Sequence, residues 1–304
     1  MILPLVDAFV PAIGLIAFGH GLKRYGWLTQ AFWTDAERLV FYVFLPALLV
    51  VATATVDLAR LPVGPLVGTI GLVLLAGTLL AFALRWAFAL DFPALTTSVQ
   101  GAIRFNNLVG FALAGPLHGA EGLALAGVVV GIMVPLINLI CVAVFALGGR
   151  AFSVRGFLVQ LARNPLLVSC LAGFALNVAG IGLPVGIGPA LRALGQAAVA
   201  LGLMVVGAAL TVEALSARPG LQAAVGAIKL VAVPLLVWLL GPLLGLSGLP
   251  LAIAVLFMAL PTASSSYIMA RQMGGDAPLM AAITTSEHLA AVATLPMVIA
   301  LAAG

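Results

Sequence analysis

Long hydrophobic runs separated by short charged connections make up almost the whole chain. Ten of these runs are about 20 residues long or longer and contain few charged side chains. About 20 apolar residues in a helix span the hydrocarbon core of a bilayer, which is about 30 Å thick. The pattern therefore predicts ten transmembrane helices, over residues 2–22, 36–56, 64–90, 93–117, 121–148, 164–183, 190–214, 221–246, 249–270 and 277–302.

The composition supports this interpretation. Of the 304 residues, 64% are hydrophobic and 7% are charged, whereas soluble domains carry about 25% charged residues. The chain is therefore expected to be an all-α polytopic membrane protein, with residues 1–304 forming a single membrane domain. Its net charge of +4 does not indicate a nucleic-acid partner.

The ten predicted helices divide into two sets of five. An odd number of spans in each set means that the second set enters from the opposite side, which predicts an inverted repeat. The repeats would cover residues 1–149 and 163–304. Asn106 matches Thr262 and Gly119 matches Gly275 at one constant offset, which is weak sequence support for the repeat.

The positions of lysine and arginine predict the orientation. With the N-terminus outside, nine basic residues lie on the cytoplasmic side and two on the external side. Cytoplasmic loops carry the excess of lysine and arginine, so both termini are expected on the non-cytoplasmic side. The nine are Lys23, Arg24, Arg38, Arg85, Arg150, Arg155, Arg163, Arg218 and Arg271, and the two are Arg60 and Arg192.

Two predicted helices contain a cluster of polar or helix-breaking residues near the middle. The helix at 249–270 contains LPTASSS, and the helix at 93–117 contains RFNN. Proline removes a backbone donor, and Asn, Ser and Thr offer the backbone alternative hydrogen bonds. Each cluster lies 12–13 residues into its helix, or about 18–20 Å at the rise of an α-helix, so both breaks are expected near the bilayer midplane.

Such breaks suggest a binding site. Unpaired backbone is tolerated at membrane depth only where it is buried in protein or lines a wet cavity. A new helix N-terminus carries about half a positive charge, and two of them facing each other would bind an anion. Thr262 and Ser264 are expected to cap the second half-helix. A simple proline kink, with serines bonded to the preceding turn, is the alternative. The predicted substrate-binding residues are Asn106, Asn107, Pro261, Thr262, Ser264 and Ser265.

Four charged or titratable side chains fall about nine or more residues inside predicted helices, away from the helix ends. Arg104 either neutralises a substrate carboxylate or satisfies the carbonyls at the end of the first half-helix. Lys229 either takes part in proton coupling, or extends towards the cytoplasm, where it could pair with Glu213. Glu287 and His288 either couple transport to protons or pair with each other. Sodium would need carbonyl and carboxylate ligands at the crossing, and no acidic residue is expected beside either break. Proton coupling or uncoupled movement of the anion is therefore expected before sodium coupling.

Several segments resemble one family of membrane transporters, the auxin efflux carriers. This family includes plant auxin exporters and bacterial permeases for malate and malonate. The resemblance implies ten helices in a five-plus-five inverted repeat, related in fold to sodium/bile-acid symporters, with the substrate at the crossing of helices 4 and 9 and elevator-type alternating access. The segments are GLIAFGHGLKRYGWL, FYVFLPALL, RFNNLVGFAL, ARNPLLVSCLAGFALN, GLMVVGAAL and ALPTASSSYIMARQMGGD.

The chain departs from the plant members of this family at two points. Phe105 stands where a proline precedes the asparagine in plant members, so the sequence supports the break at 93–117 less strongly. The long cytoplasmic loop of many plant members is replaced by about 15 residues between the fifth and sixth predicted helices. These differences favour a bacterial-type permease in the cell inner membrane.

The expected function is secondary active or facilitated transport of small organic anions, such as malate, malonate or auxin-like acids. The sequence lacks G-x-x-x-x-G-K-[ST], G-x-S-x-G and H-E-x-x-H motifs, which argues against an ATPase and against an enzyme. The alternatives are a sodium-coupled carrier like the bile-acid symporters and, more remotely, a membrane receptor or an intramembrane hydrolase. The expected partners are the anion and the lipid bilayer, with a homodimer left open and no cofactor, metal or nucleic acid.

Overall fold

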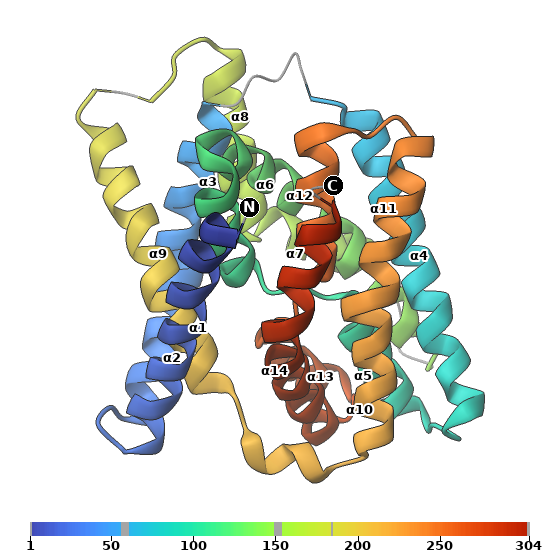
Figure 1. Cartoon of the computed structure of the whole chain (residues 1–304). Helices are drawn as coiled ribbons and strands as arrows, with labels where there is room; N and C mark the ends of the chain where they lie inside the picture. The colour runs from blue at the N-terminus through green and yellow to red at the C-terminus, as the bar shows by residue number, and fades with distance from the viewer. Residues whose placement is uncertain (1, 56–60, 149–153, 184, 303–304) are drawn as a thin grey trace. The chain divides into compact units, whose positions relative to one another are not determined.

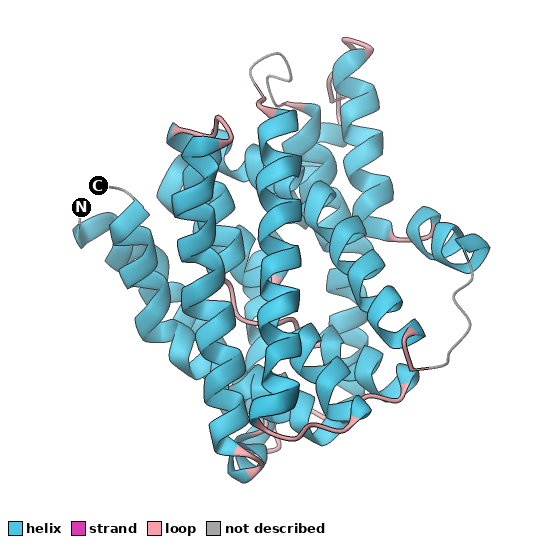
Figure 2. Ribbon diagram, turned by 90° about the vertical axis from the view of Figure 1, so that its right-hand side faces the viewer, coloured by secondary structure: helices cyan, strands magenta, loops and turns pink. Residues whose placement is uncertain are grey.

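The described part of the chain is helical. The computed structural model describes residues 2–55, 61–148, 154–183 and 185–302. Within these ranges only helices and the loops between them are present (Figure 2). The predicted all-α class is therefore confirmed.

Seven helical segments are long and apolar enough to cross a membrane, which supports a multi-pass membrane protein. One of them, Phe92–Ala146, combines two predicted helices, and Pro165–Val178 and Gly248–Ala259 are apolar but shorter. The predicted total of ten spans in two inverted sets of five stays a prediction. The seven segments are Leu5–Arg24, Gln30–Ala54, Val63–Ala87, Phe92–Ala146, Ile187–Ala209, Pro219–Leu243 and Ala277–Leu301.

The chain divides into two compact units, and each unit contains segments from both predicted repeats. Unit 1 comprises Met1–Leu61, Leu108–Val134 and Val154–Ala209. Unit 2 comprises Pro62–Asn107, Pro135–Ser153 and Leu210–Gly304.

In unit 1, helices pack closely through glycine. A Cβ atom at Gly19 of α1 would overlap the backbone of Met204 of α9, and one at Gly207 would overlap the backbone of Ile16. These two glycines let the backbones of α1 and α9 touch. The helices of unit 1 are α1 (Ile2–Arg24), α2 (Gln30–Leu39), the π-helix η1 (Val40–Phe44), α3 (Leu45–Ala54), most of α6 (Asn107–Ala146), α7 (Val154–Ala162), α8 (Pro165–Val178) and α9 (Ile187–Ala209).

Helix α6 is not continuous. Gly119 has φ of 66° and ψ of −160°, so the backbone turns there. This position lies between the predicted helices at 93–117 and 121–148. A positive φ is easily adopted by glycine because it has no Cβ, so the turn coincides with the residue that best allows it.

In unit 2, α5, α10, α13 and α14 lie side by side (Figure 1). The elements of unit 2 are α4 (Val63–Ala87), α5 (Phe92–Ile103), the end of α6, the 3-10 helix η3 (Val212–Ser216), α10 (Pro219–Ala227), the π-helix η4 (Ile228–Ala232), α11 (Val233–Leu243), α12 (Gly248–Ala259), α13 (Ser265–Met273) and α14 (Ala277–Ala302).

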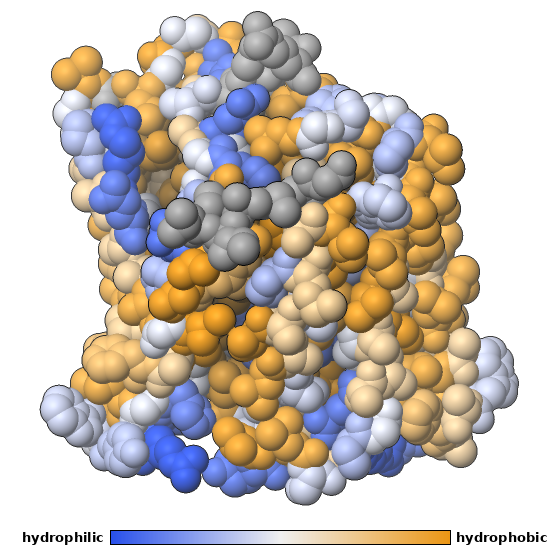
Figure 3. Space-filling view, viewed as in Figure 1, coloured by the Kyte–Doolittle hydropathy of each residue, from blue (hydrophilic) through white to orange (hydrophobic). Residues whose placement is uncertain are grey.

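Helix α4 shows how this composition suits a bilayer. Leu72, Leu75 and Leu79 follow one another at helical spacing and are exposed, whereas Val73 and Leu74 between them are fully buried. Hydrophobic side chains likewise cover much of the face seen in Figure 3. An exposed apolar stripe of this kind is suited to lipid rather than water.

Candidate functional site

Both predicted helix interruptions are present, and they contact each other within unit 2. The first, break one, is Arg104–Asn106, between the end of α5 and the start of α6. The second, break two, is Leu260–Ser264, between the end of α12 and the start of α13. The backbone N–H of Asn106 donates to the carbonyl of Pro261 at 2.8 Å. A hydrogen bond between two interrupted backbones satisfies groups that each helix has left unpaired.

Break one forms without a proline. Arg104 has φ of −75° and ψ of 160°, which is extended backbone and ends α5. Phe105 is buried, and its ring packs edge-on against Phe257 of α12, with centroids 5.9 Å apart. Gly101 allows α14 to approach α5, since a Cβ there would lie 2.8 Å from Ile283. Tertiary contacts therefore hold the break that the sequence supported less strongly.

The Thr262 hydroxyl connects the two breaks. It donates to the carbonyl of Gly101 at 2.7 Å and lies 3.3 Å from the carbonyl of Arg104. Both carbonyls lie at the end of α5, where they lack the amides of a following helical turn. Thr262 thus satisfies the end of α5, whereas the sequence had predicted a cap for the second half-helix.

The predicted capping of α13 by Thr262 and Ser264 is therefore wrong. Ser264 precedes α13, but its backbone is helical and its side chain makes no capping hydrogen bond. Its hydroxyl oxygen is buried and, among the described residues, has no hydrogen-bond partner. A serine caps from an extended backbone conformation, which Ser264 does not have.

Helix α14 places one titratable side chain at each break. Glu287 Oε2 accepts from the backbone N–H of Thr262 at 2.8 Å, in break two. His288 Nε2 lies 3.2 Å from the side-chain nitrogen of Asn106, in break one. The predicted pairing of Glu287 with His288 is wrong, because these consecutive residues contact different breaks. The expectation that no acid lies near either break is also wrong.

The contacts of His288 define its tautomer. Its Nδ1 lies 2.7 Å from the carbonyl of Thr284, and a carbonyl can only accept, so Nδ1 carries the proton. Nε2 is then the acceptor for the Asn106 amide in the neutral ring. The imidazole is buried, and both of its nitrogens have partners.

Lys229 lies in the protein interior. It was expected to extend to the cytoplasm or to pair with Glu213, and both expectations are wrong. Its side chain is fully buried, and Nζ donates to the carbonyl of Met258 at 3.1 Å. Its charge interacts with that of Glu287. Glu213, the predicted partner, lies in η3 and is exposed. Lys229 therefore neither extends to the cytoplasm nor pairs with Glu213.

Arg104 extends away from the carbonyls that it was expected to satisfy. Its guanidinium donates to Ser265 Oγ at 3.4 Å, to Asn138 Oδ1 at 3.5 Å and to the sulfur of Met269 at 3.2 Å. The thiol of Cys141 also interacts with it. All of these partners are neutral or weakly polar. Among the described residues, no carboxylate forms an ion pair with Arg104.

The remaining predicted site residues lie around the same contacts. Asn107 begins α6, and its side-chain oxygen is buried without a partner among the described residues. Pro261 contributes its carbonyl and Ser265 its hydroxyl to the contacts given above. Unit 2 thus brings all ten predicted binding and coupling residues to the breaks or to the side chains that contact them.

Two groups at the site were missed by sequence reasoning. Gln100, one turn before break one, is fully buried, and neither of its polar side-chain atoms has a partner within the described ranges. Its position as a polar residue in the last turn of α5 was a usable signal. The carbonyl of Met258 gave no signal, because any residue type supplies one.

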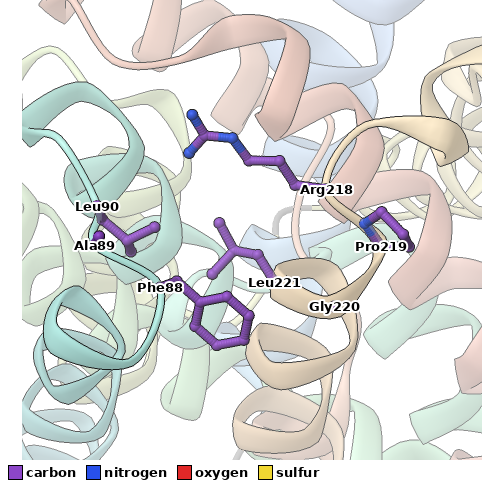
Figure 4. A pocket seen from close by; sticks show the side chains of 7 residues that line it. All are labelled: Phe88, Ala89, Leu90, Arg218, Pro219, Gly220 and Leu221. Atoms are coloured by element: carbon purple, nitrogen blue, oxygen red, sulfur yellow. The ribbon is translucent and has the colours of Figure 1, made fainter.

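Two pockets of similar size lie in unit 2. One, of about 320 Å³, runs between α10 and α14 and has Glu287 in its lining. The other, of about 340 Å³, contains Arg218 and none of the predicted site residues. Figure 4 shows the Phe88 ring beside Leu221, with the Arg218 side chain above them in that view. Of these two pockets, the first therefore has a predicted site residue in its lining and the second does not.

The described residues contain no group of three His, Cys, Asp or Glu side chains placed to hold a metal ion. The site chemistry is instead that of hydrogen-bonding side chains and the guanidinium of Arg104, whose partners are neutral. This arrangement can hold an anion.

Comparison with known proteins identifies the family. Residues 150–299 match the family described as membrane transport protein, which is the auxin efflux carrier family. The matched region contains break two, Lys229 and Glu287. No curated protein matches the chain in sequence. On this match, the chain belongs to the membrane transport protein family, the family of the auxin efflux carriers.

Proposed function

We propose that this membrane transporter carries small organic anions, and that the anion binds beside Arg104 where the two breaks meet. The observation that carries the proposal is the guanidinium of Arg104, which has only neutral partners among the described residues. A guanidinium binds a carboxylate through two parallel hydrogen bonds. The substrate class is therefore mono- or dicarboxylates such as malate or malonate, or auxin-like acids.

The surrounding groups favour an anion over a cation. The two hydrogen bonds that Arg104 makes to oxygen atoms, those of Ser265 and Asn138, are long, at 3.4 and 3.5 Å, so a carboxylate can replace them at low cost. The hydroxyl of Ser264, which can donate to a carboxylate, is buried without a partner in the described part of the chain. The charge of Lys229 is compensated by that of Glu287. Arg104 therefore supplies the net positive charge.

We propose elevator-type alternating access with unit 2 as the moving part. Support comes from the division into two compact units and from the location of both breaks in unit 2. With this mechanism we also propose the ten-helix inverted repeat, a bacterial-type permease, a location in the cell inner membrane and both termini on the non-cytoplasmic side.

Three residues were predicted to couple transport to protons, namely Glu287, His288 and Lys229. We propose that His288 is the one that does so. Its Nε2 faces Asn106 of break one, so protonation would remove the acceptor of that contact. Glu287 is the charged neighbour of His288 on α14 itself. The charged residues on or beside the elements packed against α14 are Asp91, Arg104, Glu213, Arg218, Lys229, Arg271 and Asp276. A His288→Gln variant keeps an amide at this position but has no imidazole to protonate, so it is expected to lose the pH dependence of uptake that His288 confers. Unchanged pH dependence in the variant would contradict this role.

The function is tested by transport itself. Purified protein in liposomes is expected to show saturable counterflow of a labelled carboxylate, and mono- and dicarboxylates are expected to raise its melting temperature. Asn106→Ala, which removes an amide from break one, is expected to reduce this stabilisation. Absence of counterflow for every carboxylate, together with no thermal shift, would contradict the proposal.

A further inference from the structure

Break two opens one specific hydrogen bond. In a continuous α-helix the N–H of residue 262 would donate to the carbonyl of residue 258. Here α12 ends at Ala259 and α13 begins at Ser265, so the Thr262 donor and the Met258 acceptor are separated. Both groups are buried, and leaving them unpaired in the membrane would be costly.

Two charged side chains take the places of the missing partners. The Lys229 ammonium donates to the carbonyl of Met258 at 3.1 Å, and the Glu287 carboxylate accepts from the N–H of Thr262 at 2.8 Å. Lys229 is fully buried and Glu287 is 1% exposed. Lys229 also lies in the π-helix η4, a local irregularity that is frequent at functional sites.

The groups around the ammonium are ligands that a monovalent cation would accept. The ammonium contacts the backbone carbonyl of Met258, and its charge interacts with that of the Glu287 carboxylate. The second carboxylate oxygen, Oε1, is buried and has no hydrogen-bond partner among the described residues. Oxygen ligands of this kind suit hard cations.

We propose that the ammonium group of Lys229 occupies a site at break two that could otherwise bind a monovalent metal ion. The ammonium supplies, from within the chain, the positive charge that faces the carbonyl at the end of α12 and interacts with Glu287. If this carrier moves anions as proposed above, its cycle then runs without sodium or potassium.

The test is a variant that leaves room for an ion. In Lys229→Ala, the carboxylate and the Met258 carbonyl face the space of the missing side chain. We expect the melting temperature of the purified variant to be about 5 °C or more higher in sodium or potassium chloride than in N-methylglucamine chloride at equal ionic strength. The unchanged protein is expected to melt at the same temperature in all three salts.

A matched variant tests whether cation binding requires the space left by the Lys229 side chain. Lys229→Met removes the charge but fills most of the volume, so its stability is expected to be independent of the cation. Lys229→Ser leaves room and adds an oxygen, and it serves as the second test if Lys229→Ala does not accumulate. Equal melting temperatures of Lys229→Ala or Lys229→Ser in all salts would overturn the proposal, and so would sodium stabilisation of the unchanged protein.

This result is independent of the transport assay. Melting is measured on detergent-solubilised protein without substrate, so it reports on the cation site alone. A failure of carboxylate counterflow in the unchanged protein would contradict the proposed function and leave the melting comparison valid. In liposomes, uptake by Lys229→Ala is further expected to rise about tenfold when sodium replaces N-methylglucamine, a change of about 1.4 kcal/mol.

Discussion

The two helix breaks handle charge in opposite ways. At break one a single guanidinium, that of Arg104, has only neutral partners in the described structure. At break two the opposite charges of Lys229 and Glu287 each replace one side of an opened backbone hydrogen bond. The two breaks are therefore expected to have different roles. Lys229 and Glu287 compensate each other's charge and stabilise break two, whereas the charge of Arg104 at break one is available to bind an anion.

The breaks also differ in how they are held open. Break two contains Pro261, which cannot donate to the preceding turn. Break one has no proline and depends on the packing of Phe105 against Phe257 and on the bond from Asn106 to Pro261. Break two is thus determined by its own sequence, and break one by the residues that pack against it. We expect mutations of α12 to disturb both breaks.

The largest predicted effect is loss of one of the two buried, oppositely charged side chains at break two, Lys229 and Glu287. Glu287→Ala leaves a buried ammonium without its counter-charge and the N–H of Thr262 without an acceptor. We expect a loss of about 3–5 kcal/mol of stability, measured by thermal or denaturant unfolding in detergent. The double variant Lys229→Met with Glu287→Gln has no unpaired charge and is expected to be more stable than Glu287→Ala. Equal stability of the two variants would show that the pair is not coupled.

The next effect concerns ligand binding at break one. Arg104→Gln removes the guanidinium and is expected to weaken carboxylate binding by about 10- to 100-fold, the range for a hydrogen-bonded charge. Without ligand, its melting temperature should change little, since the contacts it loses are long and neutral. Arg192→Gln, at an exposed position of unit 1, is the control and should bind as the unchanged protein does.

A smaller effect is expected for the hydroxyl that joins the breaks. Thr262→Val keeps the shape of the side chain but leaves the carbonyl of Gly101 without its donor. This should cost about 1–2 kcal/mol, measured by unfolding without ligand. A variant as stable as the unchanged protein would mean that this carbonyl finds another partner.

The smallest effect is expected for Ser264→Ala. The Ser264 hydroxyl has no partner among the described residues, so its removal should alter stability by no more than about 0.5 kcal/mol. Carboxylate binding, by contrast, should weaken if this hydroxyl contacts the ligand. Comparison of Thr262→Val with Ser264→Ala thus separates a structural hydroxyl from one available for binding.

The sequence predicted the positions of the breaks but not what surrounds them. Proline, serine and asparagine act on their own backbone, so LPTASSS and RFNN were informative without a structure. The bonds from Glu287 to Thr262 and from His288 to Asn106 join different helices. Their formation depends on how α14 packs, which no local pattern contains. For the same reason the predicted pairs of Lys229 with Glu213 and of Glu287 with His288 were wrong.

The division of charge between the breaks is tested most directly by one set of binding titrations. Malate or malonate would be titrated into the unchanged protein, Arg104→Gln, and the double variant Lys229→Met with Glu287→Gln, at equal ionic strength. We predict that Arg104→Gln loses binding by about 10-fold or more, while the double variant binds within about threefold of the unchanged protein. Retained binding in Arg104→Gln with loss in the double variant would contradict the assignment, because the anion would then depend on break two.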